Sequence, residues 1–162
     1  MKKALIILSL TILIGVTAMT VIKGNDKADV QASSSKLEKA TFAGGCFWCL
    51  EADFQERAAV IEVISGYTGG YKDNPAYKEV SQGKAGHVEA IEVIYDPDRI
   101  TYQELLDIFW KAIDPTDPDG QFVDRGSQYR SAIFYLNNEQ KILSEKSREA
   151  QEKSGRFKSQ RR

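Results

Sequence analysis

Cysteine and histidine are scarce in this chain of 162 residues, which contains two Cys and one His. A zinc site with four ligands could therefore be completed only with carboxylates. Positive charge is scarce in the central part, because residues 40–150 have 11 Lys or Arg against 19 Asp or Glu, a net charge of −8. A nucleic-acid-binding surface needs clustered basic residues, so this composition argues against one.

The chain has enough apolar residues to build a hydrophobic core. Hydrophobic residues make up 42% of the sequence, which is too many for a disordered chain. The length suits one domain, since domains commonly have about 100–200 residues. Basic residues are in excess only near the two ends, where residues 1–39 carry a net charge of +3 and residues 151–162 carry +4.

An uncharged apolar run of 19 residues, Ala4 to Ile22, follows Lys2 and Lys3. A basic segment before an apolar run is typical of a secretory signal, and this run approaches the ~20 residues that cross a bilayer as a helix. We expect residues 1–22 to be a signal peptide or a membrane anchor. The protein would then be exported, either anchored at the cell surface or secreted (periplasmic). Residues 23–39 are rich in Lys, Asp, Ser and Ala and are expected to be a linker.

Hydrophobic periodicity predicts alternating strands and helices in the remainder, which we treat as one domain, 40–162. Loops are expected at 66–74, which is rich in glycine, and at 114–127. The predicted strands are 39–43, 59–64, 88–95 and 129–135, and the predicted helices are 46–57, 75–83, 101–113 and 138–154. Two successive β-α-β units predict an α+β fold, a ferredoxin-like split β-α-β two-layer sandwich.

Cys46 and Cys49 are the first candidates for chemistry. Gly44 and Gly45 connect a predicted strand to a helix whose first turn contains Cys46. The helix dipole and unsatisfied N–H groups favour a thiolate there, and Cys49 lies one turn further on, within reach of a disulfide. We therefore favour redox or nucleophilic chemistry over two ordinary buried thiols or a static disulfide. A Cys-x-x-Cys after a strand also suggests a thioredoxin-like oxidoreductase.

Two aromatic residues and one carboxylate accompany these thiols. Phe47 and Trp48 would line an apolar pocket, although for one of them packing in the core is an equally good interpretation. Glu89 shares a strand face with Ile91 and Val93. If that face is buried, desolvation would keep Glu89 protonated and able to donate a proton. The alternative is a carboxylate that remains in water at the end of the strand.

Six segments, taken together, resemble the peptide methionine sulfoxide reductase A family, whose members reduce the S epimer of methionine sulfoxide. The resemblance extends from about Ala40 to Lys158, and the combination of GCFW with GHxE is its most specific part. The matching segments are GGCFWC (44–49), GYTGGY (66–71), NPAY (74–77), GHVEAIEVIYDP (86–97), FW…DPT (109–116) and QYRSAIF (128–134).

The resemblance implies a role for each candidate residue. Cys46 would attack the sulfoxide sulfur and become a sulfenic acid as methionine leaves, while Glu89 protonates the oxygen. The resemblance implies no metal or bound cofactor, and it implies oxidised Met-containing proteins and a thioredoxin-like thiol reductant as partners. The substrate-binding residues would be Tyr77 and Tyr129 at the oxygen, Phe47 and Trp48 around the methyl group, and Asp124 through polar contacts.

The sequence departs from the family pattern in two places. Many members have a resolving Cys in a C-terminal tail, but here no Cys follows Cys49. Cys49 is therefore the candidate resolving residue, with direct reduction by an external thiol as the alternative. Members also continue beyond a segment like Gly155 to Lys158, so we expect the C-terminal end of this domain to be incomplete.

Two other functions stay open. One is a thioredoxin-like disulfide exchanger, which would leave Glu89 and the tyrosines without a role. The other is a truncated, inactive chain that at most binds oxidised peptides. If the protein is exported, a membrane-linked thiol carrier would have to supply the reducing equivalents.

Overall fold

The computed structural model describes residues 36–157. The predicted signal or anchor segment, 1–22, lies outside the described residues, as does most of the predicted linker. Within the described part, no helix combines the length and the apolar character that a membrane crossing requires.

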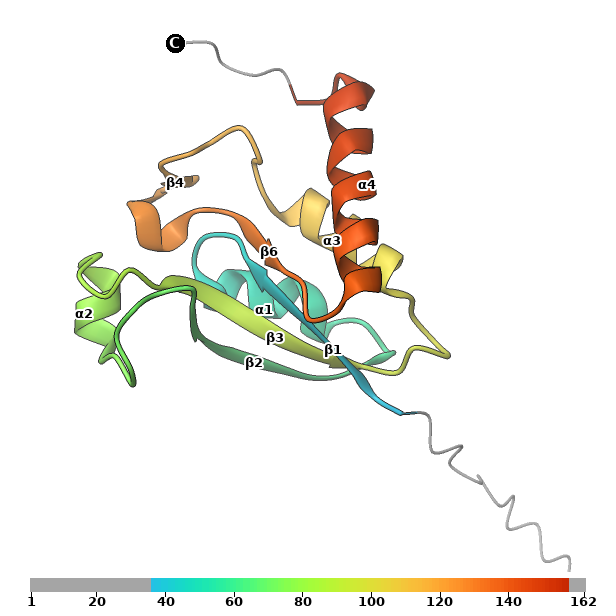
Figure 1. The fold of residues 1–162 in the computed structure, drawn as a ribbon, viewed down its shortest axis with the longest axis horizontal. Helices are drawn as coiled ribbons and strands as arrows, with labels where there is room; N and C mark the ends of the chain where they lie inside the picture. Colours follow the sequence, from blue (N-terminus) through green and yellow to red (C-terminus); the bar gives the residue numbers. More distant parts are fainter. Residues whose placement is uncertain (1–35, 158–162) are drawn as a thin grey trace, which may run out of the picture. The chain divides into compact units, whose positions relative to one another are not determined.

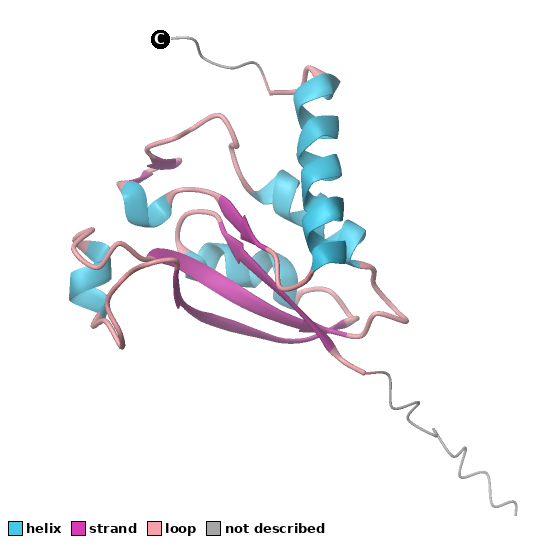
Figure 2. Ribbon diagram, viewed as in Figure 1, coloured by secondary structure: helices cyan, strands magenta, loops and turns pink. Residues whose placement is uncertain are grey.

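The described part is built on one antiparallel sheet of four strands in the order β2-β3-β1-β6 (Figures 1 and 2). The strands are β1 (Glu38–Ala43), β2 (Val60–Thr68), β3 (Val88–Tyr95) and β6 (Ala132–Phe134). Helix α1 (Phe47–Gln55) connects β1 to β2, and α3 (Tyr102–Ala112) follows β3. This order is that of the split β-α-β arrangement, so the predicted α+β fold is confirmed.

The main core lies between one face of the sheet and helices α1 and α3. Phe42 on β1 stacks on Phe54 of α1 and Phe109 of α3, with ring centroids 5.4 and 5.1 Å apart. Ile91 and Val93 of β3 are fully buried in the same cluster. The alternation predicted for β3 is therefore correct, and it places Glu89 on the helix-covered face.

Helix α4 (Asn138–Ser154) packs against α3 through polar contacts. Trp110 Nε1 donates a hydrogen bond of 2.7 Å to Ser147 Oγ, and the hydroxyls of Tyr102 and Ser144 lie 3.0 Å apart. Both helices begin as the sequence predicts. Thr101 forms a capping box at the start of α3, and Asn137 caps α4.

Two predicted loops contain regular structure. Strand β2 continues to Thr68, because Gly66 to Thr68 pair with Ala90 to Val88 of β3. The second loop contains a short hairpin, β4 (Gly120–Gln121) and β5 (Asp124–Arg125), followed by the 3-10 turn η1 (Ser127–Tyr129). The predictions of a loop throughout 114–127 and of a strand beginning at residue 129 are therefore wrong, because Tyr129 lies in η1 and β6 begins at Ala132.

The short helix α2 (Tyr77–Ser81) lies between β2 and β3. In Figure 1 it gathers with the β4–β5 hairpin at the end of the sheet where α1 begins. This end of the sheet contains the residues that the sequence singles out.

Candidate active site

Cys46 is the N-cap of α1 rather than a residue of its first turn. Its backbone is extended, and its carbonyl accepts hydrogen bonds from the N–H groups of Cys49 (3.1 Å) and Leu50 (3.2 Å). Cys46 is partly buried and Cys49 is exposed, and both are free thiols. The predicted strand-to-helix position of Cys46 is thus correct to within one residue.

Both glycines before Cys46 are required by their surroundings. Gly45 has a positive φ of 89°, a region that favours glycine, and a Cβ built on it would lie 2.8 Å from Cβ of Gln121. A Cβ on Gly44 would lie 2.6 Å from Cγ2 of Ile113. The turn that presents Cys46 therefore packs directly on the α3 end and on β4.

The two thiols contact each other. Partial desolvation raises the pKa of Cys49, and its hydrogen bond with Cys46 raises it further. The negative charge of Asp124 acts in the same direction. The structure thus brings Cys46 and Cys49 together, as their spacing of three residues predicts.

Glu89 is a buried carboxyl beside the start of α1. Its side chain is only 2% exposed, and its Oε2 accepts a 3.1 Å hydrogen bond from the backbone N–H of Phe47. Burial raises the pKa of Glu89; the Phe47 hydrogen bond opposes this rise and the charge of Asp124 adds to it. The alternative of a water-exposed carboxylate is therefore wrong.

Phe47 and Trp48 differ in burial. Phe47 is 6% exposed and belongs to the main core, whereas Trp48 is 64% exposed. The centroid of the Phe47 ring lies 5.1 Å from that of Trp48 and 5.7 Å from that of Tyr67. Trp48 stacks on Tyr77 with ring centroids 6.4 Å apart. Core packing thus applies to Phe47, whose ring also contacts the rings of Trp48 and Tyr67.

Two tyrosines lie close enough to Glu89 for its charge to act on them. Burial raises the pKa of Tyr67 and of Tyr129, and the charge of Glu89 is the next cause in both cases. The charge of Tyr77 also raises the pKa of both residues, and the charge of Asp124 raises the pKa of Tyr129. The structure therefore brings together the residues that the sequence suggests as catalytic or substrate-binding.

Tyr67 is a member of this site that the sequence analysis missed. It lies directly opposite Glu89 in the pairing of β2 with β3. Its only sequence signal is the GYTGGY segment, which contains two tyrosines and three glycines. The register that selects Tyr67 becomes visible only in the folded sheet.

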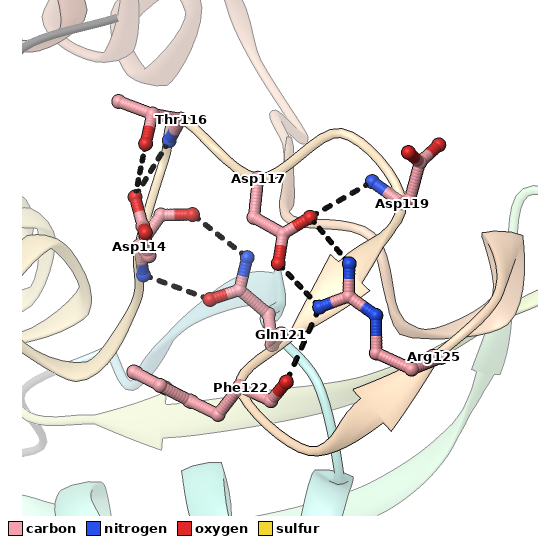
Figure 3. Close-up of polar contacts among 7 residues, drawn as sticks. All are labelled: Asp114, Thr116, Asp117, Asp119, Gln121, Phe122 and Arg125. Atoms are coloured by element: carbon pink, nitrogen blue, oxygen red, sulfur yellow. Dashed lines mark hydrogen bonds and ion pairs between the residues drawn. The ribbon is translucent and has the colours of Figure 1, made fainter. Parts of the chain in front are cut away.

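Two buried glutamines hold the segments around the site, and the sequence analysis missed these as well. Gln121 exchanges two hydrogen bonds of 2.8 Å with the backbone N–H and carbonyl of Asp114 (Figure 3). Gln128 Nε2 donates a 2.9 Å bond to the carbonyl of Ser81, which ties η1 to the end of α2. The Gln128 bond connects the segments that contain Tyr77 and Tyr129.

His87 has a structural role in the loop before α2. Its Nδ1 accepts a 3.2 Å bond from Gly70 N–H, which leaves Nε2 to donate to the carbonyl of Lys72 at 2.8 Å. Among residues 36–157, no cluster of three or more His, Cys, Asp or Glu side chains is arranged to hold a metal ion.

Comparison with known proteins identifies the family. The sequence model of peptide methionine sulfoxide reductase matches residues 38–161. The Halalkalibacterium halodurans peptide methionine sulfoxide reductase MsrA is 54% identical over 123 residues, which cover 76% of this chain and 70% of that protein. A Listeria monocytogenes protein of the same name is 54% identical over 126 residues, which cover 78% of this chain and 71% of that protein.

Solved structures agree with these relatives. Methionine sulfoxide reductase A of Corynebacterium diphtheriae superposes with a TM-score of 0.67 at 35% identity, covering 74% of this chain and 56% of that one. Reduced Mxr1 from Saccharomyces cerevisiae also superposes with a TM-score of 0.67, at 34% identity, and the match covers 74% of this chain and 71% of that one. The family and the oxidoreductase class suggested by the sequence motifs are confirmed. The chain belongs to the peptide methionine sulfoxide reductase family.

Proposed function

We propose that this chain reduces the S epimer of peptide-bound methionine sulfoxide, with Cys46 as the nucleophile and Glu89 as the acid. One observation supports this most strongly: the residue after Cys46 binds the buried Glu89 carboxyl through its backbone N–H. A carboxyl whose pKa is raised by burial keeps its proton to a higher pH than an exposed carboxyl does. It can deliver that proton to the sulfoxide oxygen as the Cys46 sulfur attacks.

The reaction transfers one oxygen atom. A bond forms between the Cys46 sulfur and the sulfoxide sulfur while Glu89 protonates the oxygen. The substrate S–O bond and the new S–S bond then break as the hydroxyl passes to Cys46, which becomes a sulfenic acid while methionine leaves. The substrate sulfur is reduced by two electrons and the Cys46 sulfur is oxidised by two. Cys49 then attacks the sulfenic acid, which releases water and leaves a Cys46–Cys49 disulfide.

The tyrosines and aromatic rings stabilise and position the substrate. Attack increases the negative charge on the sulfoxide oxygen, and the Tyr67, Tyr77 and Tyr129 hydroxyls would donate hydrogen bonds to it. The raised pKa values of Tyr67 and Tyr129 keep those hydroxyls protonated as donors. Phe47 and Trp48 would enclose the methyl group, with Asp124 making polar contacts to the rest of the substrate.

A dithiol of the thioredoxin type would reduce the disulfide and complete the cycle. Cys49 is exposed, which supports attack by such an external protein.

We also propose export of the protein, because residues 4–22 form an uncharged apolar run after two lysines. Fractionation of cells that express the full chain tests this, and recovery from the cytosol alone would refute it.

The test is a reduction assay on both epimers of a blocked methionine sulfoxide, with dithiothreitol as reductant. We expect turnover of the S epimer only. Reduction of insulin disulfides without any sulfoxide reduction would instead favour a thioredoxin-like disulfide exchanger. Cooperative melting without turnover would favour a chain that at most binds oxidised peptides.

A further inference from the structure

The tip of the β4–β5 hairpin exposes two neighbouring apolar side chains. Phe122 is 67% exposed and Val123 is 89% exposed. Exposed single apolar residues are common, but a Phe and a Val together at the end of a turn form a small exposed apolar patch. We call Phe122 and Val123 the apolar tip.

The apolar tip lies between two residues that belong to the active site. On one side, Gln121 packs against Gly45, the residue before Cys46. On the other side, the charge of Asp124 raises the pKa of Cys49 and of Glu89. The hairpin that contains the tip is therefore continuous with the wall of the site.

The hairpin is held in place by polar contacts. Arg125 binds both carboxylate oxygens of Asp117, at 2.5 and 2.9 Å, and donates a 3.2 Å bond to the carbonyl of Phe122 (Figure 3). Gln121 and Asp124 pair across the turn. Phe122 has a φ of 51°, a left-handed conformation that bulky residues rarely adopt. Figure 3 shows its ring pointing away from Arg125.

We propose that the apolar tip binds the apolar side chains that flank an oxidised methionine in an extended polypeptide. In an extended segment, the side chains next to the methionine sulfoxide lie close to the reactive centre, so the apolar ones among them can reach an exposed apolar surface at the wall of the site. The reactive centre and the apolar tip would then contact successive parts of one segment. This inference rests on the proposed function and specifies its substrates as methionine sulfoxide with apolar flanking side chains.

The test compares two peptides that contain methionine S-sulfoxide, one flanked by Leu and Val and the other by Gly and Ser. The wild-type chain is expected to prefer the apolar-flanked peptide in kcat/KM, through a lower KM. The double variant Phe122→Asn/Val123→Ser is expected to lower this preference about tenfold. Asn tolerates the left-handed conformation at position 122, so the turn is retained.

Two controls make the result decisive. Ile142→Gln removes a 42% exposed apolar side chain from α4 and is expected to leave the preference unchanged. Val123→Ser alone is a milder second variant and is expected to lower the preference by a smaller factor. An equal preference in the wild type and both tip variants would overturn the inference.

Binding in the Cys46→Ser background separates this inference from the proposed function. The dissociation constant of the apolar-flanked peptide is measured there by fluorescence anisotropy, without any turnover. Binding that weakens about tenfold in the tip variant supports the inference even if the wild type fails to reduce sulfoxides. Binding that is the same with and without the apolar tip contradicts it, whatever the activity.

Discussion

The backbone N–H of Phe47 donates a 3.1 Å hydrogen bond to Oε2 of Glu89, which lies 42 positions further along the chain. Phe47 follows Cys46 directly, so this bond places the buried carboxyl beside the thiol. Because Oε2 accepts the N–H, the proton of a neutral Glu89 belongs on the other oxygen, Oε1. A proton donor is thereby oriented next to the proposed nucleophile.

Replacing Glu89 by Gln should remove the proton donor while keeping the shape and the Phe47 hydrogen bond. We expect kcat for sulfoxide reduction to fall about 100-fold or more, which is typical for loss of a general acid. Glu92→Gln is the matched control, since Glu92 lies on the same strand and pairs with Lys39 at the surface. Steady-state assays should show the control near wild-type activity.

The raised pKa of Glu89 also predicts how stability depends on pH. In the unfolded chain the carboxyl ionises near its ordinary value of about 4.3, whereas the folded protein keeps it protonated to higher pH. The stability of the wild type relative to Glu89→Gln should therefore be greatest below about pH 4 and decline as the pH rises through the folded pKa. Melting temperatures of the two proteins at about pH 4 and about pH 8 measure this, and a difference independent of pH would contradict it.

The hydroxyls of Tyr67 and Tyr129 should contribute to catalysis more than to folding. Tyr→Phe at either position keeps the ring and removes one hydrogen-bond donor to the sulfoxide oxygen. We expect kcat to fall about tenfold or more for each, with little change in the melting temperature. Tyr135→Phe, on a ring 54% exposed, is the control and should leave kcat unchanged.

Cys49→Ser should separate the chemical step from recycling. The variant keeps Cys46, so one methionine should form per chain in a single turnover. Thioredoxin-dependent steady-state turnover should stop, because no Cys46–Cys49 disulfide can form. Steady-state rates equal to those of the wild type would remove Cys49 from the mechanism.

Two glycines provide a matched pair for testing the turn that presents Cys46. Gly45→Ala places a Cβ at positive φ and 2.8 Å from Gln121, so we expect a loss of about 2 kcal/mol or more in unfolding free energy and a lower kcat. A Cβ on Gly66 would meet nothing within 4 Å. Gly66→Ala should therefore change stability much less, and denaturant unfolding of the two variants measures the difference.

The regular elements and the two main catalytic candidates could be predicted because their signals are local. The alternation around Glu89 places it with Ile91 and Val93, and the capping residues Thr101 and Asn137 mark where two helices begin. Burial of that strand face is what converts Glu89 from a surface carboxylate into a candidate acid.

Other features depend on contacts between distant segments. The strands of the β4–β5 hairpin have only two residues each, too few to show a hydrophobic period, and the Asp117–Arg125 pair that holds them becomes visible only after folding. Tyr67 depends on the β2–β3 register. Gln121 and Gln128 are polar residues that sequence reasoning places at the surface, yet backbone hydrogen bonds satisfy them in the interior.

The most direct test of the proposed mechanism is a single turnover of the fully reduced chain without added thiol. The proposed mechanism predicts one equivalent of methionine per chain from the S-sulfoxide, a Cys46–Cys49 disulfide in the peptide mass map, and no methionine from Cys46→Ser. Methionine release by Cys46→Ser equal to that of the wild type would contradict it.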